Sequence, residues 1–155
     1  MTYTQANVEQ AVEALRRLDA DDQLAVLWFV YEEMKGGITP ATKAGLELSQ
    51  AILHRIQQMS RDEQLQVQRD IVTGADNEIT REYGALNPRA KLGVWYVLGQ
   101  GMEEQSVIPM PPDYQLSSEA QKVFDQVKQL DFENQTSFMS SAAAKMGSSP
   151  RQGAI

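Results

Sequence analysis

The sequence predicts an all-α fold of about eight short helices, and three observations support this prediction. Alanine, leucine, glutamine and glutamate, which are good helix formers, are frequent in the chain. Apolar residues recur at intervals of three and four, which places them on one side of a helix. Glycine, proline and capping residues separate the apolar segments, and no segment convincingly predicts a strand.

Composition limits the classes of function. The chain of 155 residues is long enough for one domain with its own core and too short for two full domains. Its net charge of −7 is mixed along the chain, whereas nucleic-acid binding needs a clustered basic face. The absence of cysteine excludes disulfides, thiolate metal sites and a cysteine nucleophile. The start MTYTQANVEQ lacks signal-peptide features, and no stretch approaches the roughly 20 apolar residues of a membrane span, so we expect a soluble cytoplasmic protein.

The first two predicted helices lie before the Gly36-Gly37 pair. The first covers residues 7–18, and Asp19 or Asp21 is expected to cap the second. The second contains the uninterrupted apolar run LAVLWFVY at 24–31, and a helix that is apolar on all sides is surrounded by other helices. A strand is the competing interpretation of this run, but acidic residues before and after it fit helix ends better.

Six further helices are predicted after the loop ITPATKAG, which gives way to helix after Pro40. A capping box at Ser60–Glu63 and the step Asn87-Pro88 mark two of their starts. The proline-rich stretch VIPMPPDY is expected to be extended and rigid. The expected helices are 44–59, 60–72 ending at Gly74, a short helix from a cap at Asp76 or Asn77 to Leu86, 88–104, a helix from the capping box Ser118–Gln121 to Leu130, and 133–146 ending at Gly147.

The prediction of a binding site starts from the stretch KLGVWYVLGQGMEEQSVIPM at residues 91–110. As a helix it places an aromatic and small-residue face on one side, formed by Leu92, Trp95, Tyr96, Gly99 and Met102. Gly99 and Gly101 each cost about 1 kcal/mol relative to alanine inside a helix, so the missing side chains call for a reason. Close approach of a flat or rod-like ligand is one reason, and packing of helix on helix is the other.

Residues typical of catalysis or metal binding are not grouped in this sequence. His54 is the only histidine and has no ligand partner at helical spacing. The pairs Glu32-Glu33 and Glu103-Glu104 end apolar helices, which indicates solvated helix ends rather than a shielded acid–base pair. The remaining candidate is an apolar and aromatic surface, either ordinary core or a site for a long apolar ligand; it contains Trp28, Tyr31, Trp95 and Tyr96, with Met34, Met59, Met102 and Met110. Binding is therefore favoured over enzymatic activity.

Several motifs resemble the all-helical N-terminal domain of the cyanobacterial orange carotenoid protein. They are DDQLAVLWFVYEEM, Ile56-Gln57-Gln58-Met59, Asn87-Pro88 with KLGVWYVLG, and Ile108-Pro109-Met110-Pro111 followed by Tyr114. The resemblance covers nearly the whole chain, and the chain is most similar to the stand-alone helical carotenoid proteins. It implies two interleaved four-helix bundles that grip a ketocarotenoid between them, in a carotenoid-binding domain over residues 1–147 followed by a mobile C-terminal tail over 148–155.

The resemblance also implies a set of carotenoid-binding residues and a function. The residues are Leu24, Leu27, Trp28, Tyr31, Ile71, Leu92, Trp95, Tyr96, Gly99, Met102, Met110 and Pro111. The expected pigment is a ketocarotenoid such as canthaxanthin or echinenone, held in an apolar tunnel, and the expected function is photoprotection by physical quenching of singlet oxygen. Two alternatives are direct quenching of phycobilisome excitation and a pigment-free helical interaction protein. The implied protein is a monomer in the cytoplasm near thylakoid membranes, not an enzyme.

Four departures from the two-domain relatives accompany the resemblance. Ser140 stands where those relatives have an arginine that serves the sensory domain and the antenna complex, and Arg89 replaces an asparagine of the sensory-domain interface. A leading helix of those relatives is expected to be missing, and Gln68 and Arg69 are expected to replace apolar residues beside the polyene. The first three suit a chain without the sensory domain, and the lost arginine weighs against phycobilisome binding. A separate donor resembling the C-terminal domain is a further expected partner.

Overall fold

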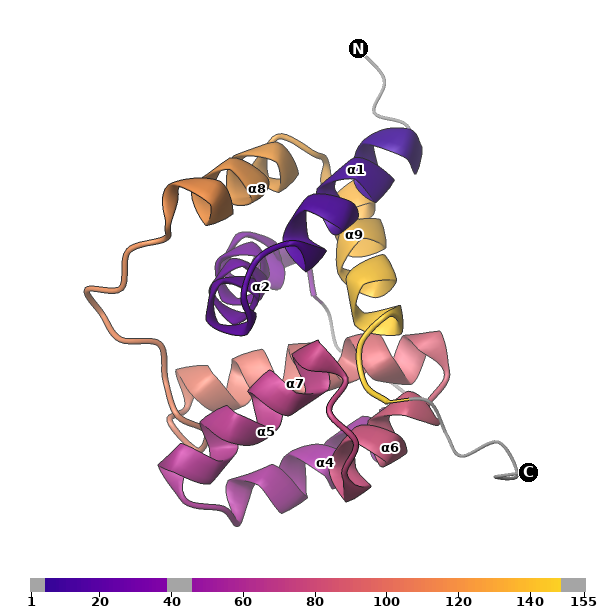
Figure 1. The fold of residues 1–155 in the computed structure, drawn as a ribbon, viewed down its shortest axis with the longest axis vertical. Coiled ribbons are helices and arrows are strands. Elements are labelled where there is room, and N and C mark those ends of the chain that lie inside the picture. Colours follow the sequence, from indigo (N-terminus) through magenta and orange to yellow (C-terminus); the bar gives the residue numbers. More distant parts are fainter. Residues whose placement is uncertain (1–4, 39–45, 149–155) are drawn as a thin grey trace. The chain divides into compact units, whose positions relative to one another are not determined.

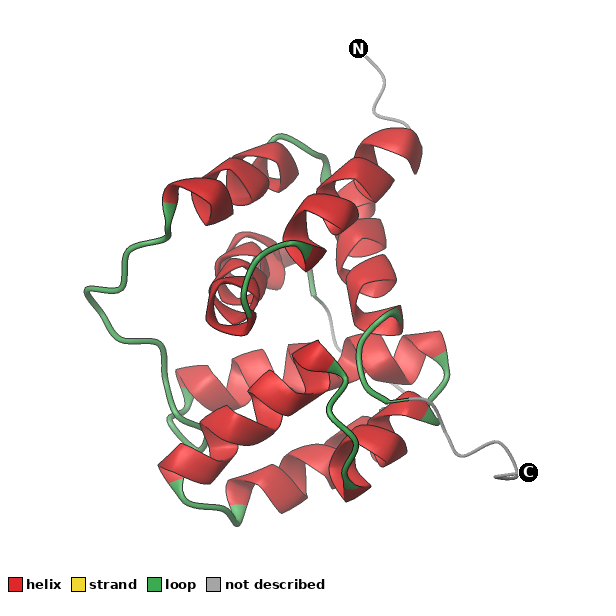
Figure 2. Cartoon of the chain, viewed as in Figure 1, coloured by secondary structure: helices red, strands yellow, loops and turns green. Residues whose placement is uncertain are grey.

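The computed structural model describes residues 5–38 and 46–148, and all regular structure in these residues is helical (Figures 1 and 2). In chain order the elements are α1 Gln5–Arg16, α2 Ala20–Met34, the 3-10 helix η1 Lys35–Gly37, α4 Glu47–Gln57, α5 Arg61–Thr73, α6 Glu78–Gly84, α7 Pro88–Glu103, α8 Ser118–Lys128 and α9 Phe132–Ala144. The prediction of an all-α fold of about eight helices is confirmed.

Polar caps begin four of the described helices where the sequence predicts them. The side chains of Asp19, Ser60, Asn77 and Asn87 each accept a hydrogen bond from the backbone of the first turn, and Ser60 forms the full capping box with Glu63. The capping box predicted at Ser118–Gln121 is wrong by one residue. Ser117 is the cap, and its Oγ accepts from the Ala120 N–H at 3.1 Å.

Predicted and observed helix ends differ most at the start of α4, which is expected at Ala44 and observed at Glu47. Residues 39–45, where a loop and the start of this helix are predicted, lie outside the described residues. The predicted C-terminal tail also lies outside them from residue 149 onward.

The chain divides into two compact units, and each combines two separate stretches of sequence. Unit 1 comprises Met1–Ala44 and Met110–Ala142, and unit 2 comprises Gly45–Pro109 and Ala143–Ile155. Unit 1 therefore contains α1, α2, α8 and nearly all of α9, whereas unit 2 contains α4, α5, α6 and α7. This division agrees with two interleaved four-helix bundles.

In unit 1, α2 and α1 both pack against α8, although α8 lies far along the chain (Figure 1). The Phe29 and Phe124 rings contact each other with centroids 5.8 Å apart. Asp22 also joins α2 to the segment before α8, because it accepts hydrogen bonds from Ser117 Oγ at 2.9 Å and Tyr114 Oη at 3.3 Å. Burial and the negative charge of Asp22 raise the pKa of Tyr114 above its ordinary value.

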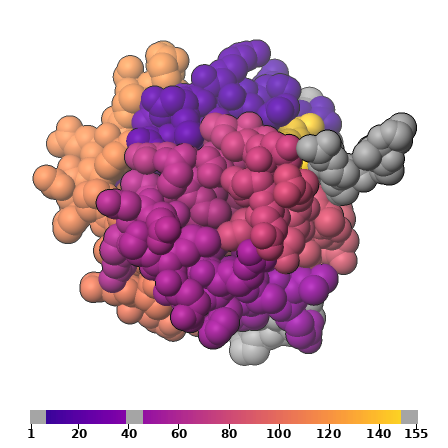
Figure 3. Space-filling model, turned by 60° about the horizontal axis from the view of Figure 1, so that its bottom comes forward, coloured from indigo at the N-terminus to yellow at the C-terminus, as the bar shows by residue number. Residues whose placement is uncertain are grey.

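In unit 2, α4 packs closely along α7. Ser49 Oγ donates to the Ala90 carbonyl at 2.7 Å, and a Cβ on Gly93 would lie 2.7 Å from both Ser49 Oγ and a methyl group of Leu46. The approach of these helices therefore depends on small side chains. In the space-filling view, the atoms of α4, α5 and α6, magenta to pink, meet in a continuous surface on the face shown (Figure 3).

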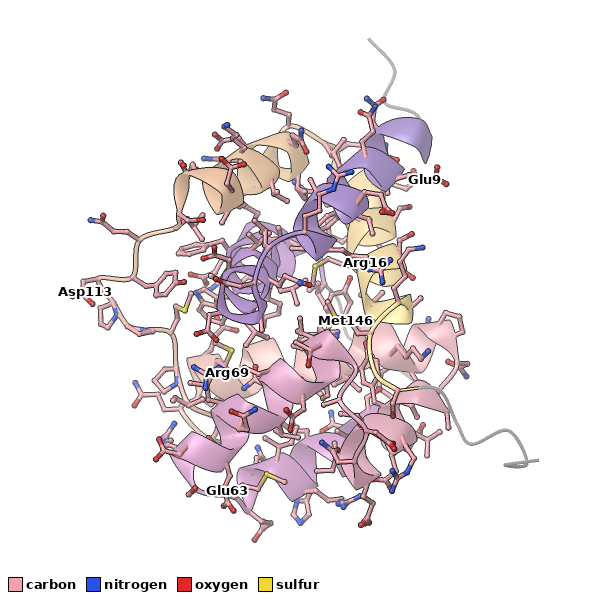
Figure 4. The ribbon with its side chains drawn as sticks, viewed as in Figure 1. Glu9, Arg16, Glu63, Arg69, Asp113 and Met146 are labelled. Carbon is pink, nitrogen blue, oxygen red and sulfur yellow. The ribbon has the colours of Figure 1, made fainter. Side chains whose placement is uncertain are left out.

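A buried glutamine on α5 holds the chain that follows α7. Gln64 Oε1 accepts from the Ile108 N–H at 2.7 Å, and Gln64 Nε2 donates to the Ser106 carbonyl at 3.2 Å. The side chain thus pairs with the backbone on both sides of Val107, which is fully buried. Its neighbour Glu63 is exposed at the start of α5 (Figure 4).

The residues at the end of α9 belong to unit 2, and we call Ala143–Ser148 the docking segment. Gly147 has φ +81° and its N–H donates to the Ile71 carbonyl at 2.7 Å, while the Ser148 N–H donates to the Thr80 carbonyl at 3.2 Å. Met146, labelled in Figure 4, is buried. A Cβ on Gly84 would lie 1.8 Å from the Ser148 carbonyl oxygen, so α6 needs glycine at its last position.

Candidate functional site

Half of the predicted site residues belong to unit 1, and four of these form the α2 face. Its members, Leu24, Leu27, Trp28 and Tyr31, follow the helical spacing of three and four residues. The Trp28 and Tyr31 rings stack with centroids 5.8 Å apart and an interplanar angle of 30°. Leu27 and Tyr31 are buried, whereas Leu24 and Trp28 are partly exposed. The structure therefore presents a partly exposed tryptophan on a buried apolar and aromatic base.

The two unit 1 residues outside α2 lie in the proline-rich stretch after α7. Met110 is half-buried, and Pro111 is exposed. Tyr114, at the end of this stretch, connects it to α2 through its hydrogen bond to Asp22. The roles of Met110 and Pro111 in binding stay predictions.

In unit 2 the predicted residues are Ile71 on α5 and five residues of α7, which we call the α7 face. These five are Leu92, Trp95, Tyr96, Gly99 and Met102. Ile71, Trp95, Tyr96 and Gly99 are buried, and Leu92 and Met102 are partly exposed. Val94, Val97 and Leu98 are buried as well, so α7 is covered on nearly all sides. Burial alone therefore does not separate the predicted face from the rest of α7.

Two glycines of α7 accommodate neighbouring parts of unit 2. Gly93 allows the close approach of α4, and a Cβ on Gly101 would lie 2.9 Å from Val107 Cγ2 and 3.2 Å from Ser106 Oγ. For Gly101, this favours packing within the protein over approach of a ligand. Gly99 remains the predicted position of ligand approach on α7.

Trp95 is held at the edge of its ring by a tyrosine that sequence reasoning did not identify. Its Nε1–H donates to Tyr83 Oη at 2.9 Å, and Tyr83 Oη donates to the Ala143 carbonyl at 2.6 Å. The two rings meet edge to face, with centroids 6.5 Å apart and an interplanar angle of 69°. Burial raises the pKa of Tyr83 well above its ordinary value, and the hydrogen bond from Trp95 opposes this rise. The phenol therefore stays neutral and keeps the proton that it donates to Ala143.

The two polar replacements on α5 differ in their surroundings. Gln68 is buried, and its Nε2 donates to the Gln64 carbonyl at 3.2 Å along the same helix. Arg69 is partly exposed on α5 (Figure 4). An amide and a guanidinium do not supply the acid and base that proton-transfer catalysis needs, so these two side chains give no support to an enzymatic site.

No metal centre or membrane span is found in residues 5–38 and 46–148. Within these ranges no three histidine, aspartate or glutamate side chains are grouped so that they could hold a metal ion. No helix in the same ranges combines the length and the apolar character needed to cross a membrane. His54 is exposed, as are Glu32, Glu33, Glu103 and Glu104.

The fold and the two faces define a class: an all-helical protein of two interleaved four-helix units that carries aromatic, apolar surfaces. A family model described as "Orange carotenoid protein, N-terminal" matches residues 1–149. An orange carotenoid-binding domain-containing protein of Nostoc sp. (strain PCC 7120) is 40% identical over 145 residues, covering 92% of this chain and 85% of that protein. The orange carotenoid-binding protein of Synechocystis sp. (strain PCC 6803) is 36% identical over 142 residues, covering 90% of this chain and 45% of that protein.

Solved structures give the same result. The red carotenoid protein of Anabaena (Nostoc) sp. PCC 7120 binding canthaxanthin has a TM-score of 0.79 and 37% identity, covering 91% of this chain and 98% of that one. The orange carotenoid protein of the same organism binding canthaxanthin has a TM-score of 0.84 and 36% identity, covering 92% of this chain and 47% of that one.

The chain belongs to the orange carotenoid protein N-terminal family, as its motifs predict. It spans nearly the full length of the red carotenoid protein and about half the length of the orange carotenoid-binding protein of Synechocystis. These relatives are described as carotenoid proteins rather than as enzymes.

Proposed function

We propose that this protein binds a ketocarotenoid and acts in photoprotection by physical quenching of singlet oxygen. The observation that carries the proposal is the stacked, partly exposed Trp28 on the buried base of the α2 face, in a fold shared with proteins described as binding canthaxanthin. The chemistry supplied by the bound pigment is the acceptance of energy from singlet oxygen and its release as heat. No side chain of the protein takes part in a bond-making step.

The residues of the two faces fit a stiff apolar ligand. All of them are uncharged, and the α2 face extends over about 10 Å and the α7 face over about 15 Å of helix. Burying apolar surface against a polyene contributes about 25 cal/mol per Å², and flat aromatic rings add stacking contacts. We propose that these faces, with Ile71, Met110 and Pro111, bind the pigment, exclude water from it and fix its orientation.

The first experiment is purification of the full chain from cells that make canthaxanthin or echinenone. We expect a structured visible absorption band that co-elutes with the protein. A colourless protein, from cells shown to contain the pigment, would contradict the proposal. Singlet-oxygen lifetimes measured with pigmented and pigment-free protein then test the quenching step. Loss of phycobilisome fluorescence on adding pigmented protein would instead favour the antenna-quenching alternative.

The proposed residues are tested by Trp28→Ala and Trp95→Ala. Both variants are expected to weaken pigment binding or shift the visible band towards the blue, with helicity retained in circular dichroism. Phe29→Ala is the matched control for α2, because Phe29 is the next residue but contacts Phe124 instead of belonging to the α2 face. Unchanged visible absorbance in both tryptophan variants would refute the proposed faces.

A further inference from the structure

A short relay of hydrogen bonds connects Trp95 with the docking segment. The indole Nε1–H donates to Tyr83 Oη, and that hydroxyl donates in turn to the Ala143 carbonyl near the end of α9. Tyr83 is completely buried and Trp95 nearly so. Each polar atom of the relay thus has its partner inside the protein, where an unpaired N–H or hydroxyl is costly.

Two further contacts hold Tyr83 in its place. Lys91 Nζ lies 5.9 Å from the centre of the Tyr83 ring and 3.4 Å from the Ala144 carbonyl, so a cation lies at the carbonyl end of α9. A Cβ on Gly147 would lie 2.5 Å from Tyr83 Cδ1. The ring is therefore confined by α7 and by both ends of the docking segment.

We propose that Tyr83 is a positioning residue that sets the orientation of the Trp95 indole through this relay. The inference rests on the proposed function, because that indole is one of the residues proposed to bind the carotenoid. Packing holds the buried Trp95 indole in its site, and the bond from Nε1 to Tyr83 Oη further restricts its side-chain torsions and hence the plane of the ring. Orientation of the plane decides how an aromatic ring stacks on a flat conjugated ligand.

The hydroxyl, rather than the ring, carries this role. Tyr83→Phe keeps the edge-to-face packing and removes both hydrogen bonds, so it isolates the positioning effect. Tyr114→Phe is the matched control, since it deletes a tyrosine hydroxyl that bonds to Asp22 in unit 1. Only the first variant acts on Trp95.

A pigment-free measurement tests the relay directly. Trp28 and Trp95 are the two tryptophans of the chain, so the indole N–H signals in an NMR spectrum are few and can be assigned by substitution. Hydrogen exchange at Trp95 Nε1 is expected to become about tenfold faster or more in Tyr83→Phe and to stay unchanged in Tyr114→Phe. Equal exchange in Tyr83→Phe and the unsubstituted protein would overturn the inference.

The pigmented protein tests the functional consequence. Tyr83→Phe is expected to shift or broaden the visible band, and in a Trp95→Phe background the same substitution is expected to have no further effect. A spectrum unchanged by Tyr83→Phe, even with reduced thermal stability, would show a merely structural tyrosine and overturn the inference. A shift that persists in the Trp95→Phe background would overturn it too, because Tyr83 would then act by another route.

The outcomes separate this inference from the proposed function. If the unsubstituted protein is colourless, the proposed function fails, and indole exchange still decides whether Tyr83 positions Trp95. If Tyr83→Phe does not fold, Gly147→Ala is the second variant, because it keeps the hydroxyl while its Cβ, at a positive φ and against the Tyr83 ring, forces the docking segment away from Tyr83. We expect it to shift the band or speed indole exchange; if it changes neither, the inference is overturned.

Discussion

Gly84→Ala tests how firmly the docking segment is held against α6. The added Cβ would lie 1.8 Å from the Ser148 carbonyl oxygen, so residues 147 and 148 must move away. That movement breaks three hydrogen bonds: Gly147 N–H to the Ile71 carbonyl, Ser148 N–H to the Thr80 carbonyl, and the hydroxyl pair of Ser148 and Thr80. At about 1 kcal/mol each the loss is about 3 kcal/mol, and the better helix propensity of alanine returns about 1 kcal/mol.

The expected net loss of about 2 kcal/mol is measured by urea unfolding followed by circular dichroism. With a slope of about 2 kcal/mol per molar urea, the midpoint is expected to fall by about 1 M. Gly36→Ala is the matched control, because a Cβ there would meet no atom within 4 Å, and its stability is expected to be unchanged or slightly raised. If Gly84→Ala is as stable as Gly36→Ala, the docking of residues 147 and 148 against α6 is refuted.

Two other predictions concern buried polar groups. Gln64→Leu is expected to lower the free energy of unfolding by about 2–4 kcal/mol, because it leaves the Ile108 N–H and the Ser106 carbonyl without their partner. Gln66→Leu is the control on the exposed side of α5 and is expected to lower the free energy of unfolding by less than about 0.5 kcal/mol. Equal urea midpoints for the two variants would contradict the role of Gln64. The second concerns pH: burial raises the pKa of Tyr83 above the ordinary 10.0, so its contribution to stability is fully present below pH 10 and is lost as the pH rises above it. Above pH 10 the free energy of unfolding is expected to fall with pH more steeply in the unsubstituted protein than in Tyr83→Phe, by up to about 1.4 kcal/mol per pH unit. Equal slopes in the two proteins would contradict the burial of a neutral phenol.

Local chemistry explains why helix starts were predictable. Asp19, Ser60 and Asn87 each bond to the N–H three residues later, so the residue and its neighbours are sufficient evidence for the cap. The start of α8 was predicted one residue late because two serines are adjacent there. The choice of Ser117 coincides with a contact that no local pattern reveals, since its Oγ also donates to Asp22, 95 residues earlier.

Features that depend on distant partners were not predictable from the residues alone. Tyr83 follows Ile79 at helical spacing, which indicates a buried position but says nothing of Trp95 or of the Ala143 carbonyl 60 residues away. The α7 glycines show the same limit. Their cost in a helix signals close approach of some neighbour, whereas the identity of that neighbour at Gly101, Val107, comes only from the structure.

Each unit combines two separate stretches of the chain, and this predicts the order in which the units fold during synthesis. Residues 45–109 supply all four helices of unit 2 in one continuous stretch, so they can collapse as soon as they leave the ribosome. In contrast, α2 must wait for α8, because these packed helices come from opposite ends of the chain. During that interval the run LAVLWFVY has no α8 to cover it, and we expect the nascent chain to engage holding chaperones through this segment.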